Sequence, residues 1–372
     1  MKYCTRCIIP YTRPGIRFDA QGNCNCATAA DKAQIDWAER EKLFRDVVDA
    51  AKKRSSANGY DCIIPVSGGK DSTWQVVKCL EYGLRPLCVT WRPPRRTELG
   101  QKNLDNLVRL GVDHIDWSIS PAVEKKFTYA AFKKFGSTAI PMHMAIFSIP
   151  LNVAVRFRIP LVIWGENSAF EYGGETDQRQ GFRLDRAWLA RNGVTNGTTA
   201  KDWVSNELTP KDLVPYFGPT DEELEAAGTL AVFLGYYFRW DPVETFQIAA
   251  KHGFSRGAAA RTGFYDFADV DDDFISLHHW LKWHKFGFTR TYDNLSLEIR
   301  NGRMSRQDAI TLIKMRGDET PHEDIEEFCN WLGISREEFF EIVEKHRNKD
   351  VWTKKDGKWV IEDFLVPDWK WK

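Results

Sequence analysis

The chain has 372 residues, and its 52 lysines and arginines are balanced by 52 aspartates and glutamates, so the formal net charge is zero. Proteins that bind nucleic-acid duplexes usually carry a basic excess, so we expect no nucleic-acid partner. We find no secretory signal and no apolar run of the roughly 20 residues that span a bilayer. We therefore expect a cytoplasmic protein with no membrane partner, whose eight cysteines are reduced.

Strand and helix patterns alternate along the first two thirds of the chain. A charged amphipathic helix is predicted over 31–56, ending at Ala57-Asn58-Gly59. The predicted strands are 60–66, 85–91, 112–119, 159–165 and 229–240. The helices predicted between and after them are 71–83, 97–111, 122–136, 142–158 (broken at Pro150) and 241–253. This alternation predicts an α/β fold with a doubly wound parallel sheet, which binds ligands at the carboxyl ends of its strands.

The remaining segments differ from this pattern. Residues 165–215 are rich in Gly, Asn, Thr and Asp and predict a long loop, much of it at the active site. After residue 256 the helices 271–287, 305–317, 321–333 and 335–348 are predicted, followed by a hairpin that turns at Asp356-Gly357. We therefore expect a cysteine knuckle at 1–30, an α/β domain at 31–255 and a mainly helical domain at 256–372.

The segment DCIIPVSGGKDSTW at 61–74 changes from an apolar run to a short polar loop. It lies between the first predicted strand and its helix, where glycines and the free N–H groups of a helix N-terminus can bind phosphate. It is not a Walker A loop, because Ile64 stands at the first glycine position and Asp71 follows Lys70. A turn that merely caps the helix is the simpler alternative. The candidate phosphate-binding residues are Ser67, Gly68, Gly69, Lys70, Asp71 and Ser72.

Four cysteines near the N-terminus form the pattern C-x2-C, sixteen residues, C-x-C. Four thiolates suit a tetrahedral structural Zn²⁺ site, and the Pro- and Gly-rich connection would need a metal to fold. Four unrelated reduced cysteines, or a catalytic Cys-x-x-Cys pair, are the alternatives. The candidate zinc ligands are Cys4, Cys7, Cys24 and Cys26.

The sequence SGGKDS resembles the SGGxDS loop of the ATP pyrophosphatase (PP-loop) superfamily. The resemblance implies an adenine nucleotide α-hydrolase-like fold that cleaves ATP between its α and β phosphates. It also implies that Asp71 holds Mg²⁺ on the phosphates, that the loop cradles pyrophosphate, and that Lys70 at the variable position takes part. Thr90 and Trp91, at the end of the second strand, would lie near the adenosine.

Further stretches resemble the N-acetyl sugar amidotransferase family of bacterial surface-polysaccharide synthesis. They are CTRCIIPYTRPGIRFD, WGENSAFEYGG (164–174), FLGYYFRWD (233–241) and residues 284–310. The resemblance implies that ATP adenylates an acetamido group of a diacetamido sugar, either nucleotide-linked (as a UDP sugar) or free, and that ammonia then replaces the oxygen. The products would be an acetamidino sugar, AMP and pyrophosphate, in O-antigen or other lipopolysaccharide and surface-glycan synthesis. A separate glutaminase partner would supply the ammonia.

Polar residues after the predicted strands are the candidates for substrate contact. Glu166 and Asn167 follow the fourth strand and would orient the acetamido group or the ammonia, with loop capping as the alternative. Glu171 and Tyr172 follow on the same loop. Arg92 and its neighbours 95 and 96 follow the second strand, as phosphate or carboxylate ligands or as a solvated basic loop.

The region between the third and fourth strands and the helical region add weaker candidates. His143 would reach the site from the segment after the third strand, although a half-buried histidine satisfied within the protein is the simpler interpretation. The aspartates at 271–273 are expected to be a helix N-terminal cluster. Four basic residues could close over the phosphates or the sugar, or be surface charges; they are Lys282, Lys285, Arg290 and Arg300.

Two other functions remain open at this stage. A tRNA-thiolating PP-loop enzyme is disfavoured by the neutral charge and by the lack of an obvious catalytic cysteine pair in the α/β segment. A nucleotide-sensing or scaffold protein would bind ATP without turning it over. The preferred hypothesis requires ATP, Mg²⁺ and Zn²⁺, and it leaves a homo-oligomer open.

Overall fold

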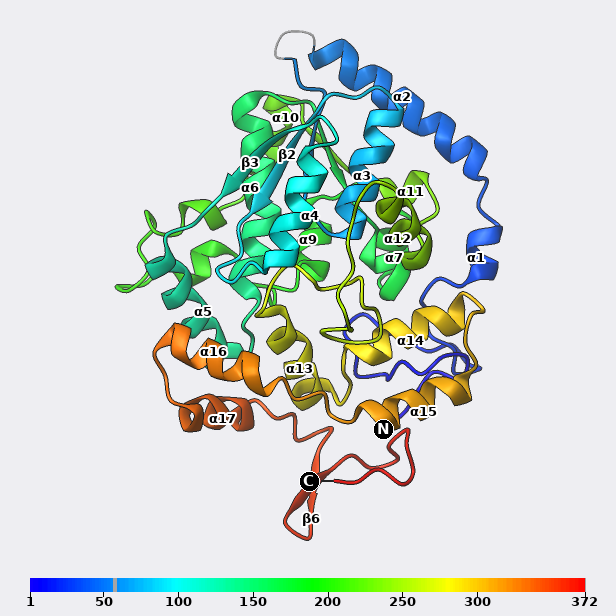
Figure 1. Ribbon diagram of the computed structural model, residues 1–372, viewed down its shortest axis with the longest axis vertical. Coiled ribbons are helices and arrows are strands. Elements are labelled where there is room, and N and C mark those ends of the chain that lie inside the picture. The colour runs from blue at the N-terminus through cyan, green and yellow to red at the C-terminus, as the bar shows by residue number, and fades with distance from the viewer. Residues whose placement is uncertain (56–58, 372) are drawn as a thin grey trace.

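The computed structural model describes residues 1–55 and 59–371, and Figure 1 shows it as an α/β core with helices below the sheet. Ala57 and Asn58, at the expected end of the first long helix, lie outside the described residues. Five parallel strands are hydrogen-bonded in the order β3-β2-β1-β4-β5. The chain leaves β1 in one direction and returns to its other side at β4, so the topological switch point lies between these two strands. The strands are β1 Cys62–Pro65, β2 Pro86–Trp91, β3 Asp113–Trp117, β4 Leu161–Trp164 and β5 Leu230–Phe233. The expected doubly wound α/β fold is confirmed.

Alternate strand residues bury against helices on the two faces of the sheet, as the two-residue period of a strand requires. Ile63 and Val162 pack with α5 (Pro121–Phe135) and α6 (Ile140–Phe157). On the other face, Ile64 packs in a cluster with the helices on that side. Those helices are α2 (Trp37–Ser55), α3 (Lys70–Glu81) and α4 (Glu98–Val108), and α12 (Pro242–Lys251) packs on α3.

Helix α6 differs from the prediction at Pro150, which lies inside an unbroken helix. A proline in a helix costs about 3 kcal/mol because it removes a hydrogen bond and crowds the preceding turn. Here the helix packs on β1, β2 and β4, and Pro150 is itself buried. In the described part of the chain, α6 is the one helix long and apolar enough to cross a membrane. It is a core helix of this sheet.

Two stretches, one apolar and one polar, contain more helix than the sequence predicted. The run 229–240 is a strand only over β5, because the chain then turns into α11 (Leu234–Tyr237). An apolar run alone does not distinguish a buried strand from a buried helix. The expected loop at 165–215 folds into short elements, and a helix also precedes β5. These are α7 Ser168–Tyr172, α8 Thr176–Gln180, α9 Arg186–Asn192, η1 Ala200–Trp203, η2 Val214–Tyr216 and α10 Asp221–Ala227.

The C-terminal region is helical, as expected, and it covers the carboxyl edge of the sheet. Arg96, just after β2, bridges to Asp272 just before α13. The hairpin turns at Asp356-Gly357 between β6 and β7, as predicted. The helix α14 was not predicted. The elements are α13 Ile275–Phe286, α14 Arg290–Arg300, α15 Arg306–Arg316, α16 His322–Leu332, α17 Arg336–Lys345, β6 Thr353–Lys355 and β7 Lys358–Val360.

Candidate active site

The loop after β1 has the backbone of a phosphate cradle. Gly68 has φ of +89°, and a Cβ placed there would lie 2.6 Å from the backbone nitrogen of Leu104. Only glycine fits that position, because other residues avoid this backbone region and the space is closed. Gly69 caps α3 without a side-chain hydrogen bond, and its N–H donates to Ser67 Oγ over 3.2 Å. The first turn of α3 is therefore a ready anion-binding surface.

Asp71 is held in a fixed position on that first turn. Its Oδ1 accepts from Trp240 Nε1 over 2.9 Å and from Thr245 Oγ1 over 3.3 Å. Its Oδ2 pairs with the ammonium of Lys70, whose side chain is 8% exposed. Lys70 Nζ also lies 5.7 Å from the centroid of the Trp240 ring. A carboxylate oriented by an indole and a hydroxyl, with only a cation on its other oxygen, fits the oxygen chemistry that Mg²⁺ prefers.

Glu166 faces Asp71 across the switch point. It follows β4, the neighbour of β1, and is half-buried. Burial, followed by the negative charge of Asp71, raises the pKa of Glu166 to about 7, while Lys70 opposes the shift. Two carboxylates, one on the first turn of α3 and one after β4, therefore interact electrostatically at this edge, and the pKa of Glu166 lies near neutral pH. Such a pair is typical of sites that carry and release protons.

Asn167 caps a helix, as the loop-capping alternative expects. Its Oδ1 caps α7 by accepting from the Ala169 N–H over 3.1 Å and also accepts from Trp188 Nε1 over 3.3 Å. Its Nδ2 donates to the Gln178 carbonyl over 2.7 Å. Both ends of the amide are thus used inside the protein, which favours a structural role over direct substrate contact.

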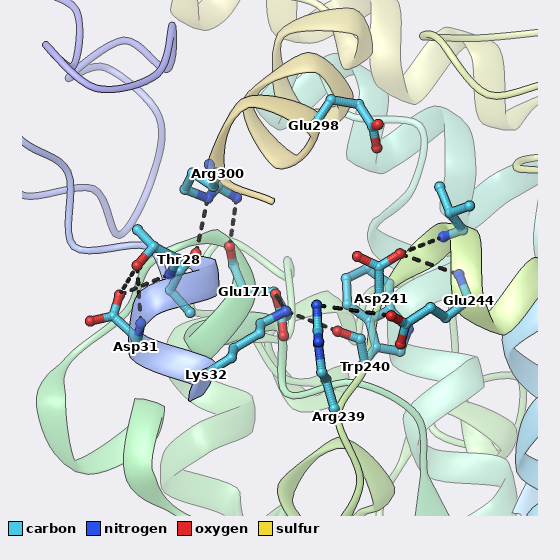
Figure 2. A network of polar contacts seen from close by, with 12 residues as sticks. Thr28, Asp31, Lys32, Glu171, Arg239, Trp240, Asp241, Glu244, Glu298 and Arg300 are labelled. Atoms are coloured by element: carbon cyan, nitrogen blue, oxygen red, sulfur yellow. Dashed lines mark hydrogen bonds and ion pairs between the residues drawn. The ribbon is translucent and has the colours of Figure 1, made fainter. Parts of the chain in front are cut away.

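Glu171 lies on α7, rather than on a loop, at the centre of the buried network in Figure 2. Lys32 Nζ donates to Glu171 Oε2 and to the Trp240 carbonyl, each over 2.8 Å. The Glu171 carbonyl accepts from Arg300 Nη2 over 2.9 Å. The ion pair therefore ties α7 to the residue whose indole holds Asp71. It leaves Glu171 as a supporting residue rather than a substrate ligand.

The same network continues to α12, as Figure 2 shows. Asp241 Oδ1 caps this helix by accepting from the Val243 and Glu244 N–H groups over 2.9 and 3.2 Å. Its Oδ2 pairs with Arg303 Nη1 over 2.6 Å. Asp241 therefore begins α12 as its N-cap, at the start of the predicted helix 241–253. Because Thr245 lies on α12, this cap also positions one of the groups that holds Asp71.

Tyr172 and His143 both lie on helices. Tyr172 ends α7, its carbonyl accepts from Arg13 Nη1 over 2.7 Å, and burial raises the pKa of its hydroxyl. His143 lies in α6, and its Nδ1 is bonded to the Ala139 carbonyl over 2.7 Å. Burial lowers the pKa of His143 to about 4, so the ring is neutral and its Nε2 is not used by that bond.

The candidates after β2 are bonded to other protein groups. Thr90 Oγ1 donates to the Val66 carbonyl over 2.6 Å, and Trp91 Nε1 donates to Glu124 Oε1 over 2.9 Å. Arg92 Nη1 lies 3.7 Å from Asp116 Oδ2, and its side chain is 54% exposed. The side chain of Thr90 supports the sheet, and Arg92 fits the solvated-loop alternative. An adenosine contact of Thr90 or Trp91 stays a prediction.

The aspartates at 271–273 do not act as one helix N-terminal cluster. Asp272 Oδ1 accepts from the N–H of Phe274, the residue just before α13, over 3.0 Å. Asp271 is bonded to the Ser67 side chain of the phosphate loop, and burial raises its pKa. The C-terminal region thus contacts the loop directly.

The N-terminal cysteines form a buried cluster. The sulfurs of Cys4, Cys7 and Cys24 lie within 4.8 Å of one another, and the Cys7 and Cys24 sulfurs are 3.6 Å apart. Cys4 Sγ accepts from the N–H groups of Cys7 and Cys24 over 3.4 and 3.2 Å, as thiolates in metal knuckles do. Arg300 Nη1 lies 3.8 Å from Cys7 Sγ. A hydrogen bond with Cys24 and, to a smaller extent, the charge of Arg300 lower the pKa of the Cys26 thiol. The donor set fits Zn²⁺. Cys26 is buried beside this trio, and its role as the fourth ligand stays a prediction.

Sequence reasoning missed the residues that support the site. Lys32 stands in a charged segment whose composition predicts a solvent-exposed helix. Its partners lie 139 and 208 residues away in the sequence. Trp240 stands inside FLGYYFRWD, a stretch that carries the family resemblance, but nothing there indicates a bond to Asp71. Arg300 was a candidate for the sugar or phosphates, and it instead connects the cysteine cluster to α7.

The comparisons with known proteins concern the helical region first. Residues 261–365 match the family model described as "LPS biosynthesis protein WbpG-like, C-terminal domain". This segment contains α13 to α17, which cover the carboxyl edge of the sheet. No curated protein matches the chain. Among solved structures, an NMN synthetase from Francisella tularensis is similar at 13% identity and a TM-score of 0.35, covering 78% of this chain and 97% of that one.

Proposed function

We propose that the protein is the synthetase subunit of an ATP-dependent amidotransferase that converts an acetamido group of a sugar to an acetamidino group. The observation that carries the proposal is a glycine phosphate loop whose Asp71 is held in place by Trp240 and acts electrostatically on Glu166, which follows the neighbouring strand. The match of residues 261–365 to a lipopolysaccharide biosynthesis family supports a surface-glycan substrate. A UDP-linked diacetamido sugar is the substrate class that the sequence resemblance favours.

The reaction divides into two displacements. The acetamido oxygen attacks the α phosphorus of ATP, pyrophosphate leaves, and the amide N–H proton is released, which gives an O-adenylyl imidate. Ammonia then attacks the imidate carbon and AMP leaves with the former acetamido oxygen. An amide oxygen is a poor leaving group and a phosphate ester is a good one, so adenylation makes the exchange feasible.

Some residues would stabilise negative charge, and another would transfer protons. Gly68, Gly69 and the first turn of α3 would bind the leaving pyrophosphate, with Lys70 neutralising charge. Asp71 would hold Mg²⁺, which supplies positive charge to the phosphates. Glu166, with a pKa of about 7, would accept the proton released at the imidate or from the attacking ammonia. The partial burial of Asp71 and Glu166 limits attack by water on the activated sugar, which would regenerate the amide.

The cysteine cluster would hold a structural zinc ion away from the reacting groups. Its link to the site is Arg300, which contacts Cys7 Sγ, the Ala27 carbonyl and the Glu171 carbonyl. We further propose that ammonia comes from a separate glutaminase, as the family resemblance implies, and that free ammonium replaces it in vitro.

The proposal is tested with ATP, Mg²⁺, ammonium and a UDP-linked diacetamido sugar. The expected result is AMP and pyrophosphate in equal amounts, with a product lighter by the difference between O and NH. The Asp71→Asn variant should fold and lack this activity. Pyrophosphate release that depends on tRNA and not on the sugar would favour the sulfur-transfer alternative and contradict the proposal.

A further inference from the structure

One face of α13 carries a row of basic residues. His278, Lys282 and Lys285 are spaced by four and three residues, which places them on the same side of a helix. All three are only partly exposed. On the opposite side of α13, Trp280 and Trp283 are buried. We call His278, Lys282 and Lys285 the α13 stripe. The two sides differ in chemistry, so the stripe is not a consequence of general surface charge.

The stripe is continued by groups from other elements. The ring centroids of His143, on α6, and His278 are 5.4 Å apart. Lys282 Nζ lies 3.2 Å from Asp293 Oδ2, on α14. Arg290, at the start of α14, lies 3.9 Å from the same carboxylate oxygen. Three helices thus bring basic side chains together at the carboxyl edge of the sheet.

These groups carry more positive than negative charge. Asp293 is shared by Lys282, Arg290 and Arg13, the last over 2.7 Å. Asp269 is the other carboxylate, 3.5 Å from Arg290 Nε. No carboxylate among the described residues lies within ion-pair distance of Lys285. The four cations are Arg13, Lys282, Lys285 and Arg290, against the two carboxylates of Asp269 and Asp293.

Burial makes the two lysine charges of the stripe costly. Burial lowers the pKa of Lys282 to about 8, and burial with the charge of Lys282 lowers the pKa of Lys285 to about 8. Buried cations are stabilised by an anion that shares charge-assisted hydrogen bonds with them. An anionic ligand would complete the network, whereas a neutral one would not.

The stripe also connects to the reacting groups. The charge of Glu166 acts on Arg290, and that of Arg290 acts on Lys282. Lys282 in turn acts on His143 and His278. The stripe is therefore coupled electrostatically, through Arg290, to the carboxylate that follows β4. This is the edge where a doubly wound sheet binds its substrates.

We propose that Lys282, Lys285 and Arg290 bind the anionic group of the sugar substrate. The inference rests on the proposed function and names the part of the substrate that this site recognises. Two sources share the required chemistry: the diphosphate of a nucleotide-linked sugar and the carboxylate of a sugar acid. In either case the anion anchors the sugar so that its acetamido group reaches Glu166.

The test is calorimetric binding to the full chain, with a non-hydrolysable ATP analogue in excess to fill the phosphate loop. The probes are UDP for the diphosphate, glucuronate for the carboxylate and N-acetylglucosamine as a neutral sugar. Lys285→Met removes a cation without a carboxylate partner and should leave the melting temperature unchanged or higher. Lys251→Met, at the exposed last residue of α12, is the matched control.

The expected result is that Lys285→Met weakens one anionic probe by about tenfold or more, the loss of one charge-assisted hydrogen bond. Lys251→Met and the neutral probe should show no change. The affected probe identifies the source of the anion. Wild-type protein that binds neither anion, or Lys285→Met that binds both normally, would overturn the inference. Absence of AMP formation with normal probe binding would refute the proposed function instead.

Discussion

The substitution Lys32→Met tests the network that supports Asp71. Lys32 and Glu171 form an ion pair over 2.8 Å, with side chains only 2% and 4% exposed. Removing one member of such a pair leaves a buried charge uncompensated and costs about 3–5 kcal/mol. Unfolding entropy is about 2.1 cal/mol/K per residue, so the 372-residue chain should lose about 4–6 °C in melting temperature.

The pH dependence gives this prediction a second signature. Burial raises the pKa of Glu171 and Lys32 opposes that shift. Without Lys32, the folded carboxyl holds its proton to higher pH than the unfolded one does. The folded state then binds more protons than the unfolded state, and stability falls as pH rises through this interval. The loss in Lys32→Met should therefore be larger at pH 8 than at pH 5.

Thermal unfolding followed by circular dichroism measures both effects. Adding Glu171→Gln to Lys32→Met removes the orphaned charge and should restore most of the stability. Lys42→Met is the surface control, since its pair with Glu39 spans 3.9 Å and is exposed, and it should change stability by less than about 1 kcal/mol. A Lys32→Met protein as stable as the wild type at pH 8, or a double variant no better than the single one, would refute the reasoning.

Three further predictions concern the loop, the base and the cysteines. Glu166→Gln should remove the change of kcat with pH that is centred near pH 7, and it should lower kcat by about 100-fold or more. If the same pH dependence persists in this variant, another residue is the base. Because the raised pKa of Glu166 makes wild-type stability fall from about pH 4.5 to 7, Glu166→Gln should gain stability relative to wild type at pH 8 but not at pH 4. Gly68→Ala should raise KM for ATP, whereas Gly302→Ala, with similar φ and open space, should not; equal effects would exclude a tight cradle. Cys7→Ser should lose zinc by elemental analysis and unfold at lower temperature, while Cys88→Ala keeps the metal; a full metal complement in Cys7→Ser would contradict the zinc site.

Local patterns predicted the parts of the fold that depend on neighbouring residues. The strand after Tyr60, the loop and α3 follow from an apolar run, two glycines and a helical period. The caps at Asp241, Ser305 and Ser335 were also predictable, and each accepts from a backbone N–H in its helix. These features are set within a few residues of chain, so one sequence is enough to find them.

Features that depend on distant contacts were not predictable. Helix α6 continues through Pro150 because its packing on the sheet outweighs the local cost. The buried position of Lys32 depends on Glu171 and Trp240, and sequence composition places such a lysine in solvent. The strand pattern placed Glu166 at the carboxyl end of the fourth strand, but its raised pKa depends on burial that only the folded chain provides.

The most direct measurement follows the acetamido oxygen. A diacetamido sugar labelled with ¹⁸O in its acetamido carbonyl is incubated with the protein, ATP, Mg²⁺ and ammonium, and the nucleotide is analysed by mass spectrometry. Adenylation of the carbonyl predicts that each AMP carries one labelled oxygen on its phosphate. Unlabelled AMP, with the label remaining in the sugar or appearing in water, would contradict the account.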